Sequence, residues 1–135
     1  MIRIGLEIHQ RLSTNKKLFC RCATDGAGKK IGELKRKLHP VPSELGKVDL
    51  AAEFEQLKNR IFCYEMFDST TCLVDADEEP PYKINPDAVQ IALVICKMMQ
   101  AYIFDEIQVM RKIVIDGSNT SGFQRTAIVG MGGKI

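Results

Sequence analysis

The sequence lacks the features of a membrane protein or a secreted protein. Its longest aliphatic run, Ile91–Ile95, has five residues, whereas a transmembrane helix needs roughly 20. The first ten residues, MIRIGLEIHQ, include a glutamate and a histidine before any apolar stretch develops, which excludes the usual order of a signal peptide. We therefore expect a cytoplasmic protein that has no membrane partner.

Signatures of a disulfide framework and of repeats are also lacking. The five cysteines are odd in number and unevenly spaced, which favours reduced thiols or metal ligands over structural disulfides. No internal repeat or low-complexity segment is present. With 135 residues, of which 45% are hydrophobic and 27% charged, the chain has the length and composition of one globular domain.

The net charge of +2 conceals two parts of opposite sign. Residues 1–47 carry 11 Lys and Arg against 4 Asp and Glu, whereas residues 48–135 carry 8 against 13. The basic excess is densest in KKIGELKRKLHP, Lys29–Pro40. Such a cluster is typical of a solvated surface loop, and it also suits contacts with the phosphates of a nucleic acid.

Local patterns predict an α+β fold with a mixed or antiparallel β-sheet and two helices. Apolar residues alternate in Ile2–Leu12, as in a strand with one buried face. Asp49 and Asn85 are candidate N-caps for a helix over Leu50–Arg60 and for a helix whose run Ala88–Tyr102 is apolar almost all round, as in a buried helix. Further strands are predicted in Arg60–Phe67, Thr70–Asp77, Phe104–Asp116 and Phe123–Met131.

Glu7 and His9 lie on the open face of the predicted first strand. Two residues apart on a strand, their Cα atoms are about 6.6 Å apart, so both side chains can reach one cation. A carboxylate suits Mg²⁺ or Mn²⁺, and an imidazole shifts the preference toward Mn²⁺ or Zn²⁺. Other ligands would have to complete the shell, and a surface ion pair or hydrogen-bonded pair is the alternative.

The segment DGSNTSGFQ, Asp116–Gln124, combines a carboxylate, three hydroxyls, an amide and two glycines. Its hydroxyls and backbone amides could hold phosphate, and Asp116 could reach a metal ion. However, Asp-Gly and Ser-Gly are also ordinary turn sequences. The segment lacks the G-x-x-x-x-G-K pattern of a P-loop, so a plain turn remains open.

Three cysteines form a candidate zinc site. Cys20 and Cys22 are separated by one residue, and Cys72 follows later in the chain. A structural Zn²⁺ site needs four ligands, and Asp75 stands where a C-x-x-C pair would place its second sulfur. Zinc is therefore one interpretation of these thiols, and reduced thiols without metal are the other.

The other polar and sulfur-containing residues predict structural roles. Cys63 and Cys96 have apolar neighbours and are predicted to lie in the core. His39, beside a proline, is predicted to be structural or solvated. The acidic run Asp75–Glu79 favours a solvated turn, with contact to a cation or a partner as the alternative.

Five segments occur together in a characteristic order between residues 2 and 129. They are IGLEIHQRL, KLFCRC, PVPSELGKVD, TTCLVDADEEPP and VMRKIVIDGSNTSGFQRTAIV. This ordered set resembles the N-terminal part of GatE, a component of archaeal glutamyl-tRNA(Gln) amidotransferase. GatE is related to GatB of bacteria and organelles, and the two define the GatB/GatE family.

The resemblance implies a fold assignment and a ligase reaction. Residues 1–135 would form the N-terminal part of the cradle domain, the catalytic core, truncated at its C-terminal end. In this family the glutamate on mischarged Glu-tRNA(Gln) is phosphorylated by ATP with Mg²⁺. Ammonia, channelled from the asparaginase-like glutaminase GatD, then displaces phosphate to give Gln-tRNA(Gln).

The resemblance also implies roles for particular residues. The Glu and His of the family's G-L-E-I-H motif help to hold Mg²⁺ in the catalytic pocket, and they correspond to Glu7 and His9. The IDGSNTSGFQ segment corresponds to a family segment beside the same pocket. The implied substrate- and ATP-binding candidates are Asp116, Ser118, Asn119, Thr120, Ser121 and Gln124.

The chain departs from the family in two respects. Many GatB sequences hold Zn²⁺ with C-x-C and C-x-x-C; Cys20, Cys22 and Cys72 match three of these positions, but Asp75 replaces the fourth. GatE is also several times longer, and later acidic residues complete its metal shell. We therefore expect the chain to be inactive without the remainder of GatE.

A non-catalytic role is the alternative to the ligase interpretation. The chain would then be a module that binds tRNA(Gln) or docks GatD. Phosphate contacts in such a module would come from five basic residues, Lys29, Lys30, Lys35, Arg36 and Lys37.

Overall fold

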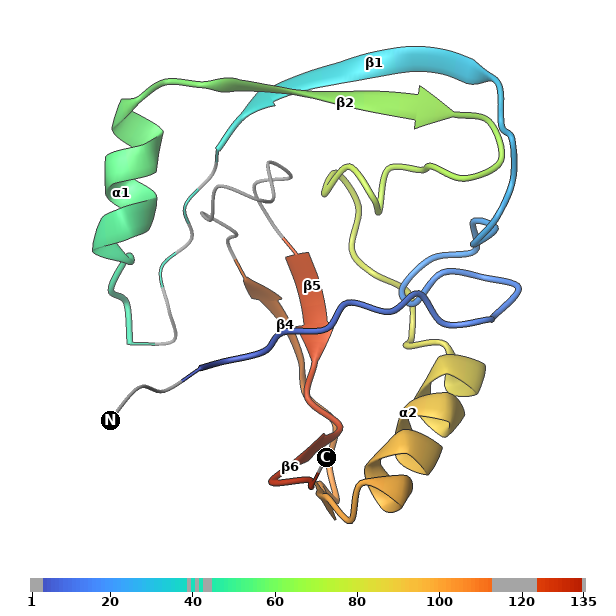
Figure 1. The fold of residues 1–135 in the computed structure, drawn as a ribbon. Coiled ribbons are helices and arrows are strands. Elements are labelled where there is room, and N and C mark those ends of the chain that lie inside the picture. Colours follow the sequence, from blue (N-terminus) through green and yellow to red (C-terminus); the bar gives the residue numbers. More distant parts are fainter. Residues whose placement is uncertain (1–3, 39, 41, 43–44, 113–123, 135) are drawn as a thin grey trace.

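The computed structural model describes residues 4–38, 40, 42, 45–112 and 124–134. They form two helices and three two-stranded antiparallel sheets, in which β1 pairs with β2, β3 with β6, and β4 with β5 (Figure 1). The predicted α+β class is confirmed, although the strands form separate ribbons instead of one sheet. The elements are β1 Lys30–Lys37, α1 Leu50–Leu57, β2 Ile61–Phe67, α2 Pro86–Met98, β3 Tyr102–Ile103, β4 Val109–Lys112, β5 Gln124–Ala127 and β6 Gly130–Met131.

The β1–β2 ribbon contains a strand that the sequence did not reveal. β1 lies in the basic segment that was predicted to be a surface loop, and it pairs with the predicted strand β2. Apart from an irregularity near its start, β1 follows β2 without interruption from Gly32 to Lys37. Lys30 joins Glu65 of β2 with an N–O distance of 2.8 Å. Cross-strand pairing therefore supports β1 despite its weak apolar alternation.

Helix α1 begins at the predicted cap. The Asp49 carboxylate accepts hydrogen bonds from the backbone N–H groups of Ala51 (2.7 Å) and Ala52 (3.2 Å), which satisfies donors that a helix start leaves open. Leu50, Phe54 and Leu57 share one side of the helix but are 62–82% exposed. The helix lies at one end of the β1–β2 ribbon (Figure 1).

Helix α2 also begins as predicted but is not a buried helix. Asn85 Oδ1 accepts a hydrogen bond from Asp87 N (3.0 Å), and Pro86 occupies the first turn. The helix ends at Met98, four residues before the end of the apolar run. Of its side chains only that of Ala88 is buried, and Met98 is 79% exposed. The apolar pattern was correct for a helix but wrong about its coverage, since one side of α2 packs against β3 and β6 while Val94, Ile95 and Met98 are exposed.

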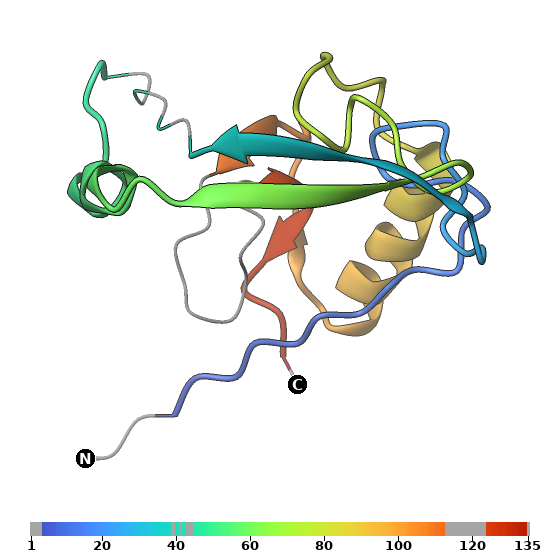
Figure 2. The same cartoon turned by 90° about the horizontal axis from the view of Figure 1, so that it is seen from above.

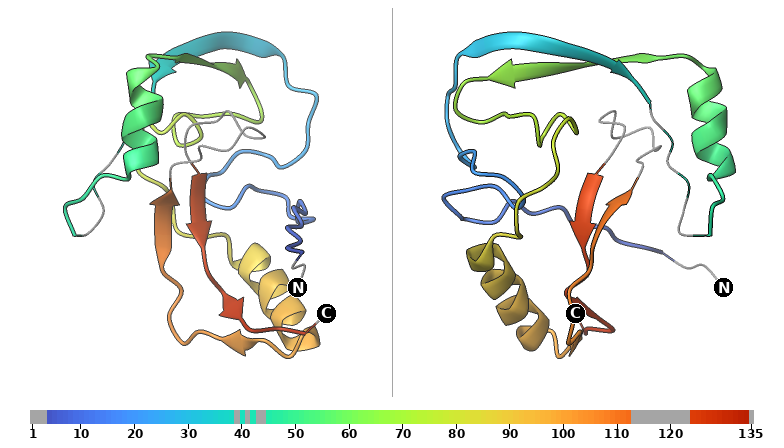
Figure 3. Two further views of the ribbon diagram at one scale, coloured as in Figure 1. Left: turned by 60° about the vertical axis from the view of Figure 1, so that its left-hand side comes forward. Right: turned by 180° about the vertical axis from the view of Figure 1, so that it is seen from behind.

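The β4–β5 hairpin confirms part of two longer predicted strands. Val109 faces Ala127, and Arg111 faces Arg125, in an antiparallel register. The hairpin stands between the β1–β2 ribbon and the β3–β6 ribbon (Figure 3). Residues 113–123, which connect β4 to β5, lie outside the described residues, as does His39.

Two predicted strands are wrong. Residues 4–12 form no strand in the described structure, and Ile4, Leu6 and Ile8 are 91%, 77% and 73% exposed. Figure 2 shows this segment leading away from the ribbons toward the N-terminus. Alternation alone cannot make a strand because the backbone also needs a partner strand. The segment Thr70–Asp77 forms successive turns instead, and Asp77 has a φ of 61°.

The most buried apolar side chains lie largely in loops. Backbone hydrogen bonds join the two loops concerned, from Tyr82 N to Phe19 O (2.9 Å) and from Asn85 N to Leu18 O (2.8 Å). No helix within the described ranges is long and apolar enough to cross a membrane. The buried apolar residues are Phe19, Cys20, Ala52, Val74, Ala76 and Ala88.

Candidate functional site

Glu7 and His9 form a solvent-exposed pair. The His9 Nε2 atom lies 3.0 Å from Glu7 Oε1, and the side chains of His9 and Glu7 are 74% and 80% exposed, respectively. The two groups form the surface pair that was the predicted alternative to a metal site, and the backbone around them is not a strand. Both groups can turn toward a common cation, and their exposure leaves room for other ligands.

A cavity of about 530 Å³ is lined by residues that follow this pair in the sequence, beginning with Gln10, whereas Glu7 and His9 are not among its lining residues. This volume falls within the range of small-molecule sites. Gln10 and Arg11 line it on the N-terminal side, and Gln124 lines it from the start of β5. The remaining lining residues are Leu12, Thr14, Lys17, Leu18, Phe19, Cys20, Thr24, Val74, Asp75, Ala88 and Arg125.

Of the six candidates in the segment Asp116–Gln124, Gln124 is the one in the described structure. Its position at the cavity places it near the N-terminal segment that carries the Glu7–His9 pair. The other five candidates, Asp116, Ser118, Asn119, Thr120 and Ser121, lie outside the described residues.

The three candidate zinc cysteines meet in space, together with Asp75. The sulfur atoms of Cys20, Cys22 and Cys72 and a carboxylate oxygen of Asp75 all lie within 4.8 Å of one another. Asp75 Oδ2 is 3.8 Å from Cys20 Sγ and 3.7 Å from Cys72 Sγ. The loop that carries Cys20 and Cys22 is closed by a hydrogen bond from Lys17 N to Cys22 O (2.9 Å).

Burial affects the protonation of this cluster. Loss of solvent raises the pKa of the Cys20 thiol, and it is also the largest cause that raises the pKa of Cys22 to about 12. Without a cation both groups are therefore protonated at neutral pH, and a bound metal ion would displace their protons. Three sulfurs and one carboxylate are donors that tetrahedral Zn²⁺ accepts. The donor set therefore fits zinc.

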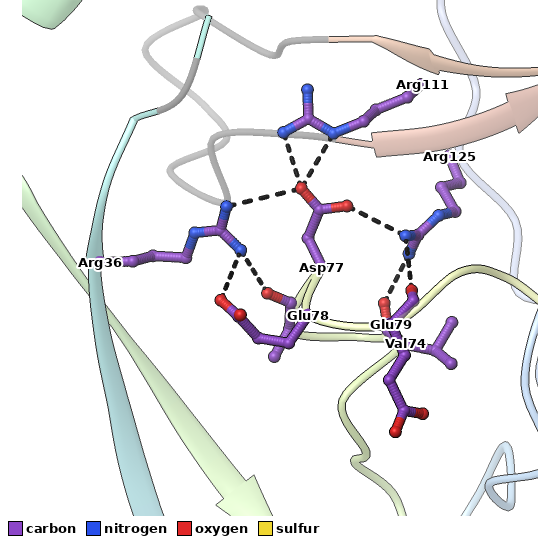
Figure 4. Close-up of polar contacts among 8 residues, drawn as sticks. Arg36, Val74, Asp77, Glu78, Glu79, Arg111 and Arg125 are labelled. Carbon is purple, nitrogen blue, oxygen red and sulfur yellow. Dashed lines mark hydrogen bonds and ion pairs between the residues drawn. The ribbon is translucent and has the colours of Figure 1, made fainter. Parts of the chain in front are cut away.

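Asp77 is the centre of an ion-pair network that the sequence did not reveal (Figure 4). Arg111 of β4 donates from Nη2 (2.7 Å) and Nε (2.9 Å) to Asp77 Oδ2, and Arg125 of β5 donates from Nη2 to Oδ1 (3.0 Å). Arg36 of β1 contributes a longer ion pair of 3.5 Å. The Asp77 side chain is only 10% exposed, so the prediction of a solvated turn is wrong for this residue.

The same arginines also bind the backbone of the Asp77 loop. Arg125 Nη1 donates to the carbonyl oxygen of Val74 (2.5 Å), and Arg36 Nη1 donates to that of Ala76 (2.5 Å). Figure 4 shows the Glu79 carboxylate pointing away from the arginines, while its carbonyl oxygen accepts from Arg125. We name Asp77, Arg36, Arg111 and Arg125 the arginine hub. It joins three strands to one loop.

The basic segment is partly neutralised. Lys30 pairs with Glu33 (2.6 Å) as well as with Glu65, and Arg36 belongs to the arginine hub. Lys29, Lys35 and Lys37 are exposed.

The two remaining cysteines differ in exposure. Cys63, which was predicted to lie in the core, is exposed, because it stands on the outer side of the β1–β2 ribbon with Sγ 3.4 Å from Glu33 Oε2. Cys96 is half-buried on α2. A side chain added at Gly130 of β6 would lie 2.8 Å from Cys96 Sγ, so this contact requires glycine.

Comparisons with known proteins agree over nearly the whole chain. A sequence model described as the GatB/GatE catalytic domain matches residues 2–135. GatE of the glutamyl-tRNA(Gln) amidotransferase from Aeropyrum pernix is 53% identical over 134 residues, and GatE from Saccharolobus islandicus is 54% identical over 134 residues. GatE from Sulfolobus acidocaldarius is 53% identical over 135 residues. Each alignment covers 99% of this chain but 21% of the relative, so the chain spans about a fifth of their length.

Proposed function

We propose that this chain, which belongs to the GatB/GatE catalytic domain family, supplies part of the ATP- and Mg²⁺-binding pocket of an ATP-dependent Glu-tRNA(Gln) amidotransferase. In this proposal residues 1–135 are the N-terminal part of the cradle domain. The observation that carries the proposal is the Glu7–His9 pair, 3.0 Å apart and open to solvent, directly before Gln10, which lines a cavity of about 530 Å³.

The pair fits a cation that is shared with a nucleotide. Glu7 supplies a carboxylate oxygen and His9 a ring nitrogen, and the high exposure of both side chains leaves space for water and phosphate oxygens. When bound, Mg²⁺ would offset the negative charge of the ATP phosphates and of the transferring phosphoryl group. Glu7 and His9 would fix where that charge is held.

The cavity supports an anionic substrate with an apolar part. Arg11, Lys17 and Arg125 line it as cations, each of which is also ion-paired with an aspartate, and Gln124 adds an amide that can orient a ligand. Leu12 and Phe19 contribute an apolar surface that excludes water. A glutamyl carboxylate that reacts with ATP brings additional negative charge into the pocket, so this combination suits the proposed reaction.

The full reaction would need partners. In the proposal, ATP converts the side-chain carboxylate of Glu-tRNA(Gln) to an acyl phosphate, and ammonia then displaces phosphate to give Gln-tRNA(Gln). The proposed partners are the remainder of GatE, the glutaminase GatD, which supplies ammonia, and tRNA(Gln). We propose that the chain alone does not amidate Glu-tRNA(Gln), which an assay with ammonium as the nitrogen donor can check.

A second metal ion belongs to the proposal. Cys20, Cys22 and Cys72 would hold Zn²⁺, because their sulfur atoms converge with one carboxylate. Such a centre would link the loop that contains Cys20 and Cys22 to the loop that contains Cys72. The role would be structural, as in other sites in which protein side chains supply all the ligands.

The nucleotide site can be tested with the paramagnetic complex of Mn²⁺ and ATP. The chain contains two histidines, so the imidazole NMR signals can be assigned with a His9→Gln variant. We expect the complex to broaden the His9 signals of the wild-type chain. Glu7→Gln should require at least about tenfold more complex for the same broadening, because loss of a charged ligand costs more than about 1.4 kcal/mol.

The matched control is Glu53→Gln, which removes an exposed carboxylate from α1. The His9 signals of this variant should broaden at the same concentration of the complex as those of the wild type. If Glu7→Gln and the wild type respond equally, or if broadening centres on residues far from His9, the proposed site is rejected.

A tRNA-binding module is the second candidate function. The exposure of Lys29, Lys35 and Lys37 favours it, although Lys30 and Arg36 are engaged within the chain. If this function is correct, a Lys35→Glu and Lys37→Glu double variant should bind tRNA more weakly and with a flatter dependence on salt. An unchanged slope would reject tRNA contact through β1.

A further inference from the structure

The Asp75 carboxylate lies at the cysteine cluster with its two oxygens in different surroundings. Oδ2 accepts hydrogen bonds from the Cys72 backbone N–H (3.2 Å) and from Lys17 Nζ (3.2 Å). Oδ1 lies 3.9 Å from Cys20 Sγ. The oxygen that the protein holds, Oδ2, also lies nearest the sulfurs, 3.8 Å from Cys20 Sγ and 3.7 Å from Cys72 Sγ.

The turn from Cys72 to Asp75 places the carboxylate where a second sulfur of a C-x-x-C pair would lie. Ala76 N donates to Cys72 O (3.2 Å), which closes the turn, and Asp75 Oδ2 binds the backbone N–H at its start. Cys72 Sγ and Asp75 Oδ2 are 3.7 Å apart. The local backbone thus presents a sulfur and an oxygen to one point.

We infer that Asp75 completes the zinc centre as its fourth ligand, and that Lys17 is the positioning residue that holds the Asp75 carboxylate for this role. The inference rests on the proposed zinc site. It goes further because it assigns the fourth ligand and a residue outside the ligand set.

Charge explains why a lysine is needed there. Three thiolates and one carboxylate around Zn²⁺ leave a net charge of −2, and the group is partly buried, with the Asp75 side chain 29% exposed. Buried charge without a counter-ion is costly. Lys17, 31% exposed, reduces the imbalance and restricts the orientation of the carboxylate.

Lys17 is itself held close to the cluster. Its backbone N–H donates to Cys22 O (2.9 Å), and Lys16 pairs with Ala23 in an antiparallel bridge. The loop that carries two of the cysteine ligands therefore also carries the residue that holds the fourth ligand. Lys17, Cys20 and Asp75 all line the cavity, so the centre borders it.

Cobalt provides the test, because Co²⁺ replaces Zn²⁺ and its absorption spectrum reports the ligands. The reduced full chain is titrated with Co²⁺ without oxygen, and affinity for Zn²⁺ is measured by competition. The variants are Asp75→Asn, Asp75→Cys, Lys17→Met and Lys17→Arg. Lys16→Met is the matched control, since it removes the neighbouring exposed lysine.

We expect an absorption spectrum of tetrahedral Co²⁺ with sulfur ligands for the wild type. Asp75→Cys should intensify the sulfur-to-cobalt charge-transfer band, because a fourth thiolate joins the shell. Lys17→Met should weaken metal affinity by about 10–100-fold while leaving the band positions unchanged, as expected for loss of an outer partner. Lys17→Arg should recover part of the affinity, and Lys16→Met should match the wild type.

Three outcomes would overturn the inference. An Asp75→Asn chain with wild-type spectrum and affinity would exclude Asp75 as a ligand. Equal affinities of Lys17→Met and Lys16→Met would exclude the positioning role, and this comparison applies even if Asp75→Asn fails to fold. A wild-type chain that binds no Co²⁺ would reject the zinc proposal itself, whereas normal Co²⁺ binding with unaffected variants would reject only the roles of Asp75 and Lys17.

Discussion

Two ion pairs of nearly equal length differ greatly in their surroundings. In the N-terminal region, Arg11 Nη1 lies 2.8 Å from Asp25 Oδ1, with side chains 73% and 82% exposed. In the arginine hub, Arg111 Nη2 lies 2.7 Å from Asp77 Oδ2, with side chains 25% and 10% exposed. Distance alone would rank the pairs as equal. Burial and the number of shared partners distinguish the two pairs, because water competes more strongly with the first pair than with the second.

The Asp77 carboxylate also offsets repulsion between the arginines of the hub. Arg111 and Arg125 face each other directly across the β4–β5 hairpin, where like charges oppose pairing. Asp77 lies between them and neutralises part of that repulsion, and Arg36 adds a third positive charge. By contrast, Glu7 and His9 in the described N-terminal segment form a simple two-residue pair.

The variant Asp77→Asn should have the largest effect on stability, and it tests whether the arginine hub contributes more than the exposed pairs. It should lower the free energy of unfolding by about 3–5 kcal/mol, since it leaves partly buried arginines without their counter-ion. Urea denaturation, followed by circular dichroism, measures the effect as a lower midpoint or as loss of the transition. The control is Glu79→Gln in the same loop, whose carboxylate points away from the arginines (Figure 4); it should change the value by less than about 0.5 kcal/mol. If Asp77→Asn and Glu79→Gln lowered the free energy of unfolding equally, the special role of Asp77 in stability would be contradicted.

The Asp49 carboxylate should make an intermediate contribution to stability, between those of Asp77 and Glu7. Asp49 is exposed, but it accepts two backbone hydrogen bonds at the start of α1. Asp49→Ala should cost about 1 kcal/mol, as is typical for loss of an N-cap. Amide hydrogen exchange in α1 measures this locally.

Asp49→Asn is the control for that measurement. An amide oxygen can still accept the same hydrogen bonds, so this variant should retain most of the protection of α1. If Asn and Ala behave alike, the charge and not the cap would be responsible.

The helix caps show what can be predicted from the sequence. Asp49 and Asn85 were identified as caps because the donor groups lie two or three residues away along the chain. The chemistry of a helix start is local, so a short window contains it. The same holds for the exposed approach of His9 to Glu7, which depends on a spacing of two residues.

The hub and β1 depend on residues far apart in the sequence. Arg36 and Asp77 are separated by 41 positions, and Arg125 follows 48 positions after Asp77. No periodicity encodes such a meeting. One signal was nevertheless present, since Arg111 and Arg125 lie in two predicted strands joined by a short segment, and two arginines that face each other across paired strands need a counter-ion.

For the zinc candidates, the sequence predicted the residue types but not that the side chains meet. Their residue types indicated possible ligands, and Cys20 and Cys22 are local, but convergence with Cys72 depends on how two loops pack. Lys17 was missed as a partner of Asp75 because it lies 58 residues away.

A smaller effect concerns acid pH in the β1–β2 ribbon. The hydrogen bond from Lys30, the largest cause, lowers the pKa of Glu33 in the folded state. A folded pKa below the unfolded value of about 4.3 means that the stabilisation is present above this value and disappears as the pH falls through the folded pKa. The stability difference between wild type and Glu33→Gln should therefore shrink when urea unfolding is measured below pH 4 instead of at pH 7. A difference that grows in acid would contradict this sign.

The smallest expected effect on stability is that of Glu7→Gln, in contrast to the large effect expected for Asp77→Asn. Its carboxylate is 80% exposed, and its His9 partner is 74% exposed, so water replaces the lost contact. We expect urea midpoints of the variant and the wild type to coincide at low and high salt, while Asp77→Asn shifts strongly in the same experiment. A clear loss of stability would show that Glu7 is held by contacts beyond His9, and the contrast between the two regions would then be wrong. Coincident midpoints, together with weaker broadening by Mn²⁺–ATP, would show that the pair contributes to ligand binding without contributing to the fold.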